Sequence, residues 1–186
     1  MYKKIATLFT MFLLAYSGIC FADSFYVVKV YDGDTIKARM KDTDINIRLV
    51  GIDAPEISVD AHNAGQPYSR EAKEFLEELV LKKFVEIRGY GYLSYNALLG
   101  EVFFDGKNVN IEMARAGFCE VIKDADPHDL LDLTPFIDAE EMSRSAKRGV
   151  WAQGDAYVSP RDWRGKQVSK SGAAILLYGI LQQNEK

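Results

Sequence analysis

Apolar and polar positions alternate along much of the chain in the way that half-buried strands require. Residues 25–31 combine valines with aromatic side chains, and residues 35–40 resume the pattern after an Asp-Gly pair. In residues 45–49 the apolar side chains stand at odd positions, so Arg48 is predicted to face away from the core. Two further short apolar runs are predicted to be strands, at residues 84–87 and 98–104.

Helical spacing of apolar residues appears after the third predicted strand. Residues 72–80 carry apolar side chains at i, i+3, i+4, i+7 and i+8, and Ser69 is expected to cap this helix. A short helix is predicted at residues 111–116, with Asn110 as its cap and Gly117 at its end.

The last predicted helix begins with Thr134 as its cap and Pro135 in its first turn, and it ends before Gly149. There is no internal repeat and no linker rich in proline or glycine. Five short strands with three helices predict an α+β fold, mostly β, in which the strands form a small barrel. The OB-fold satisfies this pattern.

The first residues have the form of a secretory signal. Lys3 and Lys4 precede an apolar stretch at residues 5–15, and Ala22 offers a small residue for cleavage. We expect an exported protein, periplasmic or secreted. The apolar run at residues 173–181 is too short to span a bilayer. The expected organisation is a signal peptide at residues 1–22, one domain at residues 23–166 and a tail at residues 167–186.

Charge and cysteine content narrow the functional classes. Removing the signal takes away two lysines, so 21 basic and 27 acidic residues remain and the net charge becomes −6. This balance argues against broad electrostatic capture of nucleic acid. Acids concentrate in residues 120–141 and bases in residues 144–170, which leaves a local basic face or a solvated helix and tail as alternatives. Cys119 would be the single cysteine, predicted to be a buried apolar side chain.

Candidate chemistry lies in two stretches. The first runs from Asp32 to Thr35 and contains Asp34; the second runs from Arg48 to Glu56 and contains Asp53. Carboxylate oxygens bind hard cations, and a guanidinium grips a phosphate with a planar fork of donors. The Asp-Gly pair taken alone favours the simpler interpretation, a hairpin turn among surface charges. Arg48 inside an apolar strand, followed by two acids, favours the metal and phosphate interpretation.

These motifs resemble the staphylococcal nuclease, or thermonuclease, family over residues 25–165. The matching stretches are Val30-Tyr-Asp-Gly-Asp-Thr-Ile36, Arg48-Leu-Val-Gly-Ile-Asp-Ala-Pro-Glu56, Leu99-Gly-Glu-Val-Phe-Phe-Asp-Gly-Lys-Asn-Val-Asn110 and Lys147-Arg-Gly-Val-Trp151. The resemblance implies a five-stranded OB barrel with three helices. It also implies Ca²⁺-dependent cleavage of single-stranded DNA or RNA.

The resemblance also assigns roles to particular residues. Asp34 and Asp53 would bind Ca²⁺ together with the backbone carbonyl of Ala54. Glu56 would position or deprotonate the attacking water. Arg48 would hold the phosphate and stabilise the charge that develops on it. The chemistry is coherent, because a cation and an arginine together neutralise a phosphodiester before hydroxide approaches it.

The chain departs from the family pattern at two places. The family has a second phosphate-binding arginine where this chain has Ala97. The aromatic residues expected after the second helix are replaced by Ile122-Lys123-Asp124-Ala125. Arg88 and Lys107 are candidates for compensation, although each is also explained as a solvated charge.

Three functional hypotheses follow. The leading one is an exported, Ca²⁺-dependent nuclease, weakened by Ala97 and acting as a monomer on single-stranded DNA or RNA. The alternative is a catalytically inactive nuclease-like module that binds nucleic acid or a protein partner. A third is a structural module of the cell envelope, docked through the apolar run in the tail.

Overall fold

The computed structural model describes residues 24–58, 65–93, 97–123 and 130–166. The predicted signal peptide and the predicted tail therefore lie outside the described residues, and so does the apolar run at 173–181. Within the described ranges, no helix is long and apolar enough to cross a membrane.

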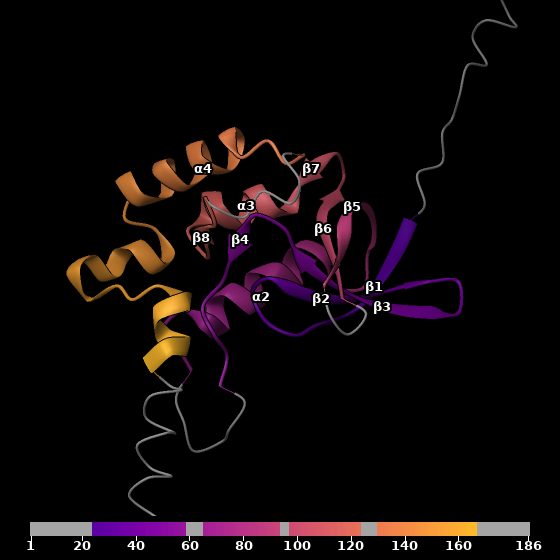
Figure 1. Ribbon diagram of the computed structural model, residues 1–186, viewed down its shortest axis with the longest axis horizontal. Helices are drawn as coiled ribbons and strands as arrows, with labels where there is room; N and C mark the ends of the chain where they lie inside the picture. The colour runs from indigo at the N-terminus through magenta and orange to yellow at the C-terminus, as the bar shows by residue number, and fades with distance from the viewer. Residues whose placement is uncertain (1–23, 59–64, 94–96, 124–129, 167–186) are drawn as a thin grey trace, which may run out of the picture.

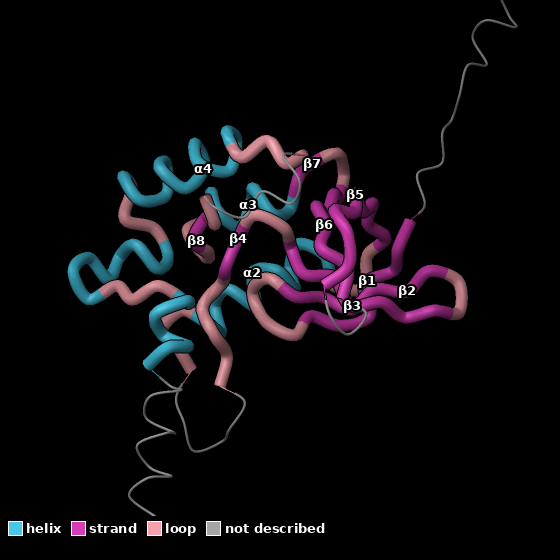
Figure 2. The backbone as a smooth tube through the Cα atoms, viewed as in Figure 1, coloured by secondary structure: helices cyan, strands magenta, loops and turns pink. Residues whose placement is uncertain are grey.

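Five strands form a closed barrel. They are β1 (Ser24–Val30), β2 (Thr35–Met40), β3 (Thr43–Leu49), β5 (Phe84–Leu93) and β6 (Ala97–Phe104). Antiparallel pairing runs in the order β3-β2-β1-β5-β6, and a parallel pairing of β3 with β6 closes the barrel. Figure 2 shows these strands at one end of the molecule and most of the helices at the other. The predicted five-stranded barrel is confirmed.

Short elements and helices cover one end of the barrel (Figure 1). The helices are α2 (Ser69–Val80), α3 (Val109–Ala116) and α4 (Thr134–Ser145), followed by the 3₁₀ segment η1 (Gly149–Ala156). Three two-residue strands complete the fold: β4 (Ile52–Asp53), β7 (Lys107–Asn108) and β8 (Glu120–Val121). The sequence did not predict these short strands, because two residues carry no periodicity. A further helical stretch at residues 160–166 was also missed.

The core lies inside the barrel and beneath the helices. Ile47 and Leu49 of β3 are buried, whereas Arg48 between them is only partly buried, so the predicted alternation is confirmed. Phe136 of α4 is fully buried with them, and so is Cys119, as expected for a small apolar side chain.

Three predicted helix caps are wrong. Ser69 is the first residue of α2, and the capping position belongs to Tyr68 in a left-handed conformation. The side chain that caps α3 is Asn108, which accepts a hydrogen bond from Ile111 N at 3.2 Å.

Asn110 lies inside α3 and instead links β6 to Val50, the residue that follows β3. It is fully buried and donates to the carbonyl oxygens of Val50 and Gly100, while it accepts from Val102 N at 3.0 Å. Thr134 does not cap α4 either, because Leu133 holds that position. A cap and a buried bridge both favour asparagine, so residue type alone did not separate the two roles.

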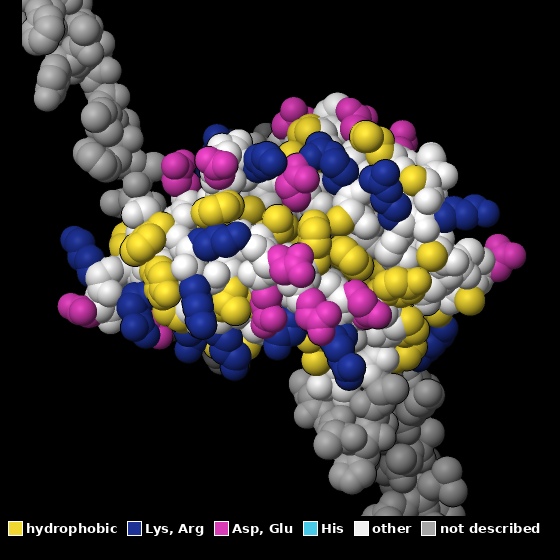
Figure 3. Space-filling view, turned by 180° about the vertical axis from the view of Figure 1, so that it is seen from behind, with side chains coloured by type: hydrophobic (Ala, Val, Ile, Leu, Met, Phe, Trp, Pro, Cys, Tyr) yellow, Lys and Arg dark blue, Asp and Glu magenta, His cyan; other side chains and the backbone are white. Residues whose placement is uncertain are grey.

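Charged side chains of both signs are interspersed with apolar ones on the face shown in Figure 3. This distribution fits the moderate net charge of −4 for the whole chain.

Candidate active site

The connection between β1 and β2 presents Asp34 at the end of the barrel. Tyr31 N donates to Thr35 O at 2.9 Å, and Asp34 N donates to the Asp32 carboxylate at 3.0 Å, so the chain reverses tightly. Gly33 allows a close approach, since a Cβ there would lie 2.7 Å from the Cβ of Ala54. The turn thus brings Asp34 against the segment that follows β4.

Asp34 is buried, with 3% of its surface exposed. Its carboxylate accepts hydrogen bonds from Thr35 Oγ1 and from the amide of Ala54, each at 2.9 Å. Burial raises the pKa of Asp34 to about 7, against the opposing effect of the Arg48 guanidinium. Burial disfavours the ionised form of this carboxylate, and a further positive charge beside it would favour that form.

Arg48 joins the two predicted metal-binding carboxylates. Its Nη1 lies 3.1 Å from Asp34 Oδ1, and its Nη2 lies 2.9 Å from Asp53 Oδ1. The strand alternation explains this placement, because it turns Arg48 out of the core toward the ends of the loops. Asp34 and Asp53, nineteen positions apart in the sequence, therefore pair with the same guanidinium.

A second arginine, which sequence reasoning missed, lies on the other side of Asp53. Arg164 makes a two-pronged contact with the Asp53 carboxylate, with Nη1–Oδ1 at 3.0 Å and Nη2–Oδ2 at 2.8 Å. The same Nη1 also pairs with Glu56 Oε1. Arg164 had been counted only among the bases of residues 144–170. Nothing local in the sequence distinguishes it from those neighbours.

Gln66 is the second site residue that the sequence did not reveal. Gln66 is buried. Its side-chain oxygen accepts a hydrogen bond from Glu56 N at 3.1 Å, and its backbone N–H donates to Glu56 O at 2.9 Å. Its side-chain nitrogen donates to Val158 O at 2.7 Å. Gln66 therefore fixes the backbone of Glu56 and ties it to the segment that carries Arg164.

The charges of this cluster do not balance. Asp34, Asp53 and Glu56 meet Arg48 and Arg164, so three carboxylates face two guanidiniums. One negative charge is in excess once Asp34, whose pKa burial raises to about 7, has lost its proton. Oxygen donors with excess negative charge fit a hard divalent cation. The described residues hold no group of three or more His, Cys, Asp and Glu side chains arranged to bind a metal. Two carboxylates would leave the remaining coordination positions to backbone oxygen and water.

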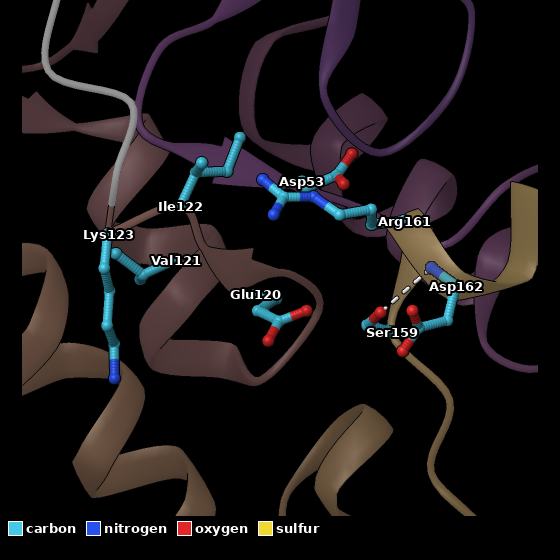
Figure 4. Close-up of a pocket in the computed structure, with 8 residues that line it drawn as sticks. All are labelled: Asp53, Glu120, Val121, Ile122, Lys123, Ser159, Arg161 and Asp162. Atoms are coloured by element: carbon cyan, nitrogen blue, oxygen red, sulfur yellow. Dashed lines mark hydrogen bonds between the residues drawn. The ribbon is translucent and has the colours of Figure 1, made fainter. Parts of the chain in front are cut away.

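A groove of about 370 Å³ opens beside Asp53 (Figure 4). Figure 4 shows the side chain of Arg161 extending toward Asp53, with Ser159 and Asp162 on the same wall. Glu120, Val121, Ile122 and Lys123 form the opposite wall. Buried Glu140 of α4 holds this wall, since it accepts from Val121 N at 2.8 Å. The groove is lined by charged side chains of both signs, with Lys123 and Arg161 as its basic groups and Asp53, Glu120 and Asp162 as its acidic ones.

The two residues proposed from the sequence to compensate for Ala97 lie elsewhere in the barrel. Arg88 on β5 pairs with Glu101 of β6 at 3.2 Å, and Glu101 also accepts from Tyr90 and Asn108. Lys107 is exposed on β7. Ala97 itself begins β6 and pairs with Asn46 of β3, two residues before Arg48.

The family model described as staphylococcal nuclease homologue matches residues 46–153. A protein named "Uncharacterized endonuclease" from Escherichia coli is 34% identical over 155 residues, which covers 83% of this chain and 93% of that protein. One with the same name from Haemophilus influenzae is 32% identical over 139 residues, covering 74% of this chain and 71% of its own length. "Probable endonuclease LCL3" from Leptosphaeria maculans is 27% identical over 146 residues, covering 70% and 49%.

Proposed function

The chain belongs to the family of staphylococcal nuclease homologues, and on this premise we propose that it is a Ca²⁺-dependent nuclease that hydrolyses phosphodiester bonds of DNA or RNA. The observation that carries the proposal is the continuous chain of contacts Asp34–Arg48–Asp53–Arg164–Glu56. It brings three carboxylates, one of them partly exposed, together with two guanidiniums, which supports a site for a cation and a phosphate.

Asp34 and Asp53 would hold the cation, with the carbonyl of Ala54 as a third donor. The hydrogen bond from Ala54 N to Asp34 Oδ2, at 2.9 Å, supports this assignment because it fixes Ala54 beside the carboxylate. Bound Ca²⁺ would neutralise a phosphate oxygen and lower the barrier to attack by water.

Arg48 would bind the phosphate with a planar pair of donors. Its guanidinium already lies between two carboxylates, so its orientation is set before substrate arrives. Preorganised donors of this kind stabilise the charge that builds on the phosphoryl oxygens in the transition state.

Glu56 would act as the general base. Its side chain is 36% exposed, which leaves room for a water molecule beside it. The water oxygen forms a bond to phosphorus while Glu56 accepts the water proton, and the phosphorus–ester oxygen bond breaks. The leaving oxygen takes a proton from solvent, so the products are a phosphate monoester and an alcohol.

The alternative function is a nuclease-like module that binds nucleic acid or a protein partner without cleaving. Ala97 favours it, because this position offers no hydrogen-bond donor to a phosphate. The intact set of Asp34, Arg48, Asp53 and Glu56 favours catalysis, since binding alone does not require a general base.

A cleavage assay separates the two functions. Purified protein would be incubated with labelled single-stranded DNA or RNA in Ca²⁺ and, in parallel, in a chelator. The proposal expects shortened products in Ca²⁺ and none in the chelator, with the signal lost in Glu56→Gln. Retention of labelled strands without any cleavage would support the binding module instead.

Further properties belong to the same proposal. The predicted signal at residues 1–22 supports export. We expect both DNA and RNA to be substrates, because the roles proposed for Arg48, Arg164 and the cation concern the phosphate and not the sugar. We also expect a monomer. Fractionation of cells carrying the full chain, followed by gel filtration of the purified protein, tests both points: cytoplasmic retention would contradict export, and a dimer mass would contradict the monomer.

A further inference from the structure

We propose that Arg164 is a second phosphate-binding arginine of this nuclease, delivered to the site by the helical residues 160–166. The inference rests on the proposed function and adds to it a residue that lies outside the matched family region, which ends at residue 153. The juxtaposition that carries it is the position of one guanidinium between Asp53, a metal-binding carboxylate, and Glu56, the proposed base.

The geometry places Arg164 where the reacting phosphate must lie. A phosphate attacked by water from Glu56, and neutralised by a cation on Asp53, has to be in reach of both carboxylates. Nη1 of Arg164 already contacts both, at 3.0 Å from Asp53 Oδ1 and through its pair with Glu56 Oε1. A guanidinium fork that pairs with a carboxylate has the same geometry toward a phosphate, so a small rotation exchanges one anion for the other.

A series of contacts brings the arginine to this position. Trp151 donates from Nε1 to Ser143 Oγ at 3.0 Å, which anchors η1 to α4. Tyr157 packs on Trp151 with ring centroids 4.7 Å apart and donates to Glu120 at 3.2 Å. These contacts fix the start of the segment that leads to residues 160–166.

Two further contacts complete the support. Val158 O accepts from Gln66 Nε2 at 2.7 Å, and Ser159 Oγ accepts from Asp162 N at 3.0 Å at the beginning of the helical turn. Figure 1 shows residues 160–166, in yellow, beside the segment that follows β4. Because Gln66 also holds the backbone of Glu56, a single buried side chain sets the distance between the base and the helix that carries Arg164.

The exposure of Arg164 separates a functional role from a purely structural one. Its side chain is 42% exposed, although it pairs with a nearly buried Asp53. The side chain of Arg164 is therefore partly accessible from solvent. Arg161 of the same helix extends toward Asp53 from the groove (Figure 4). An incoming phosphate can reach Arg164 without unfolding the segment.

Ala97 provides an independent position at which to test the role. Its partner Asn46 lies two residues before Arg48 on β3, so the side chains at 97 and 48 are on the same face of the sheet. An arginine introduced at 97 would project toward the same side of the site from a different element. If Arg164 supplies a guanidinium that position 97 lacks, Ala97→Arg should replace part of its function.

The experiment compares four proteins: the parent, Arg164→Ala, Arg164→Lys and the double variant Arg164→Ala with Ala97→Arg. Lys166→Ala is the matched control, because it removes an exposed positive charge from the same helical stretch. Each protein is measured for cleavage of single-stranded DNA in Ca²⁺, for binding of a fluorescent oligonucleotide in chelator, for Ca²⁺ binding by calorimetry and for thermal stability.

We expect Arg164→Ala to lower the maximal rate by at least about a hundredfold, given what transition-state arginines contribute. Arg164→Lys should retain a small part of the rate, since it keeps the charge but loses the fork. Ca²⁺ binding should be kept or become tighter in Arg164→Ala, because a competing cation leaves Asp53. Arg164→Ala should also bind the oligonucleotide more weakly than the parent. The double variant should recover at least about tenfold of the lost rate. Lys166→Ala should behave as the parent.

Three results overturn the inference while leaving the nuclease proposal standing. If Arg164→Ala cleaves as fast as the parent, Arg164 is only a structural contact. If it cleaves faster, Arg164 inhibits the reaction by occupying the site. A slower rate accompanied by lost Ca²⁺ binding, or by a lowered melting temperature without weaker oligonucleotide binding, would show that it only holds the site together. A parent that cuts nothing in Ca²⁺ would overturn the proposed function itself.

Discussion

Asp34 shows how a single buried residue can limit the stability of the metal-free protein. It is 3% exposed, and its ion pair with Arg48 is shared with Asp53. Burial raises the pKa of Asp34 from 3.8 in the unfolded chain to about 7. The folded state then holds its proton more tightly than the unfolded state between these two values.

The first prediction concerns the pH dependence of this stability. Because the folded state binds more protons, the free energy of unfolding without Ca²⁺ should decrease as the pH rises from about 4 to about 7. Asp34→Asn should remove this slope and be several degrees more stable than the parent near pH 8. Melting curves across this range check it, with the exposed Asp138→Asn as control. A parent whose stability increases through the window would contradict the assignment.

The second prediction concerns the two residues proposed to act on the phosphate and the water. Glu56→Gln keeps the shape of the side chain but removes the base, and Arg48→Lys keeps the charge but removes the fork. Each should lower the rate of DNA cleavage at least about tenfold. Initial rates on single-stranded DNA provide the measurement. If both variants cut as fast as the parent, the activity belongs to another site.

At the scale of elements, α3 and the 3₁₀ segment η1 meet through two glycines. Gly117 ends α3 in a left-handed conformation, and its carbonyl accepts from Val150 N at 2.9 Å. A Cβ on Gly149, whose φ is +53°, would lie 2.1 Å from Gly117 O. This contact fixes how α4 leads into η1, and therefore how the last helical residues reach the site.

The third prediction tests that junction. Gly149→Ala should lower the free energy of unfolding by more than about 2 kcal/mol, because it adds a backbone clash to an unfavourable φ. Gly106→Ala is the matched control: its φ is +72° but a Cβ there meets nothing within 4 Å. It should cost about 1 kcal/mol. Urea denaturation measures both, and equal losses would show that the close approach has no energetic weight.

Elements with long periodic patterns were predictable, and their ends were less so. In α2 and in β3 around Arg48, one face of the element is buried and carries the apolar side chains. The spacing of those side chains is visible in the sequence. The predicted caps were wrong because residue type alone does not decide which residue takes the capping position. Tyr68 adopts a left-handed conformation without a capping side chain, and Asn110 serves three partners on other elements instead of its own helix.

At the scale of the whole molecule, four of the six residues that build the site could be predicted and two could not. Asp34, Arg48, Asp53 and Glu56 lie within two motifs whose spacing already indicates the chemistry. Arg164 and Gln66 join them only through the tertiary fold: the contact from Arg164 to Asp53 spans 111 residues, and the contact from Gln66 to Val158 spans 92. Neither residue belongs to a local pattern, so no periodicity or motif could assign it.

The fourth prediction concerns Gln66, which connects the two halves. Gln66→Leu keeps the volume of the side chain but removes its hydrogen bonds to Glu56 and Val158. Cleavage should slow at least about tenfold, because the base and the segment of Arg164 lose their common support. Ca²⁺ binding should be unchanged, since Asp34 and Asp53 are held by Arg48. Parallel rate and calorimetric measurements check this, and an unchanged rate would show that Gln66 is dispensable for positioning.

Calorimetric titration of the purified protein with Ca²⁺ tests the central claim most directly, because the proposed mechanism requires one cation on Asp34 and Asp53. The account predicts heat with a stoichiometry near one, a higher melting temperature in Ca²⁺, and loss of both in Asp53→Asn. Absence of heat and of thermal stabilisation in the parent, or unchanged binding in Asp53→Asn, would contradict it.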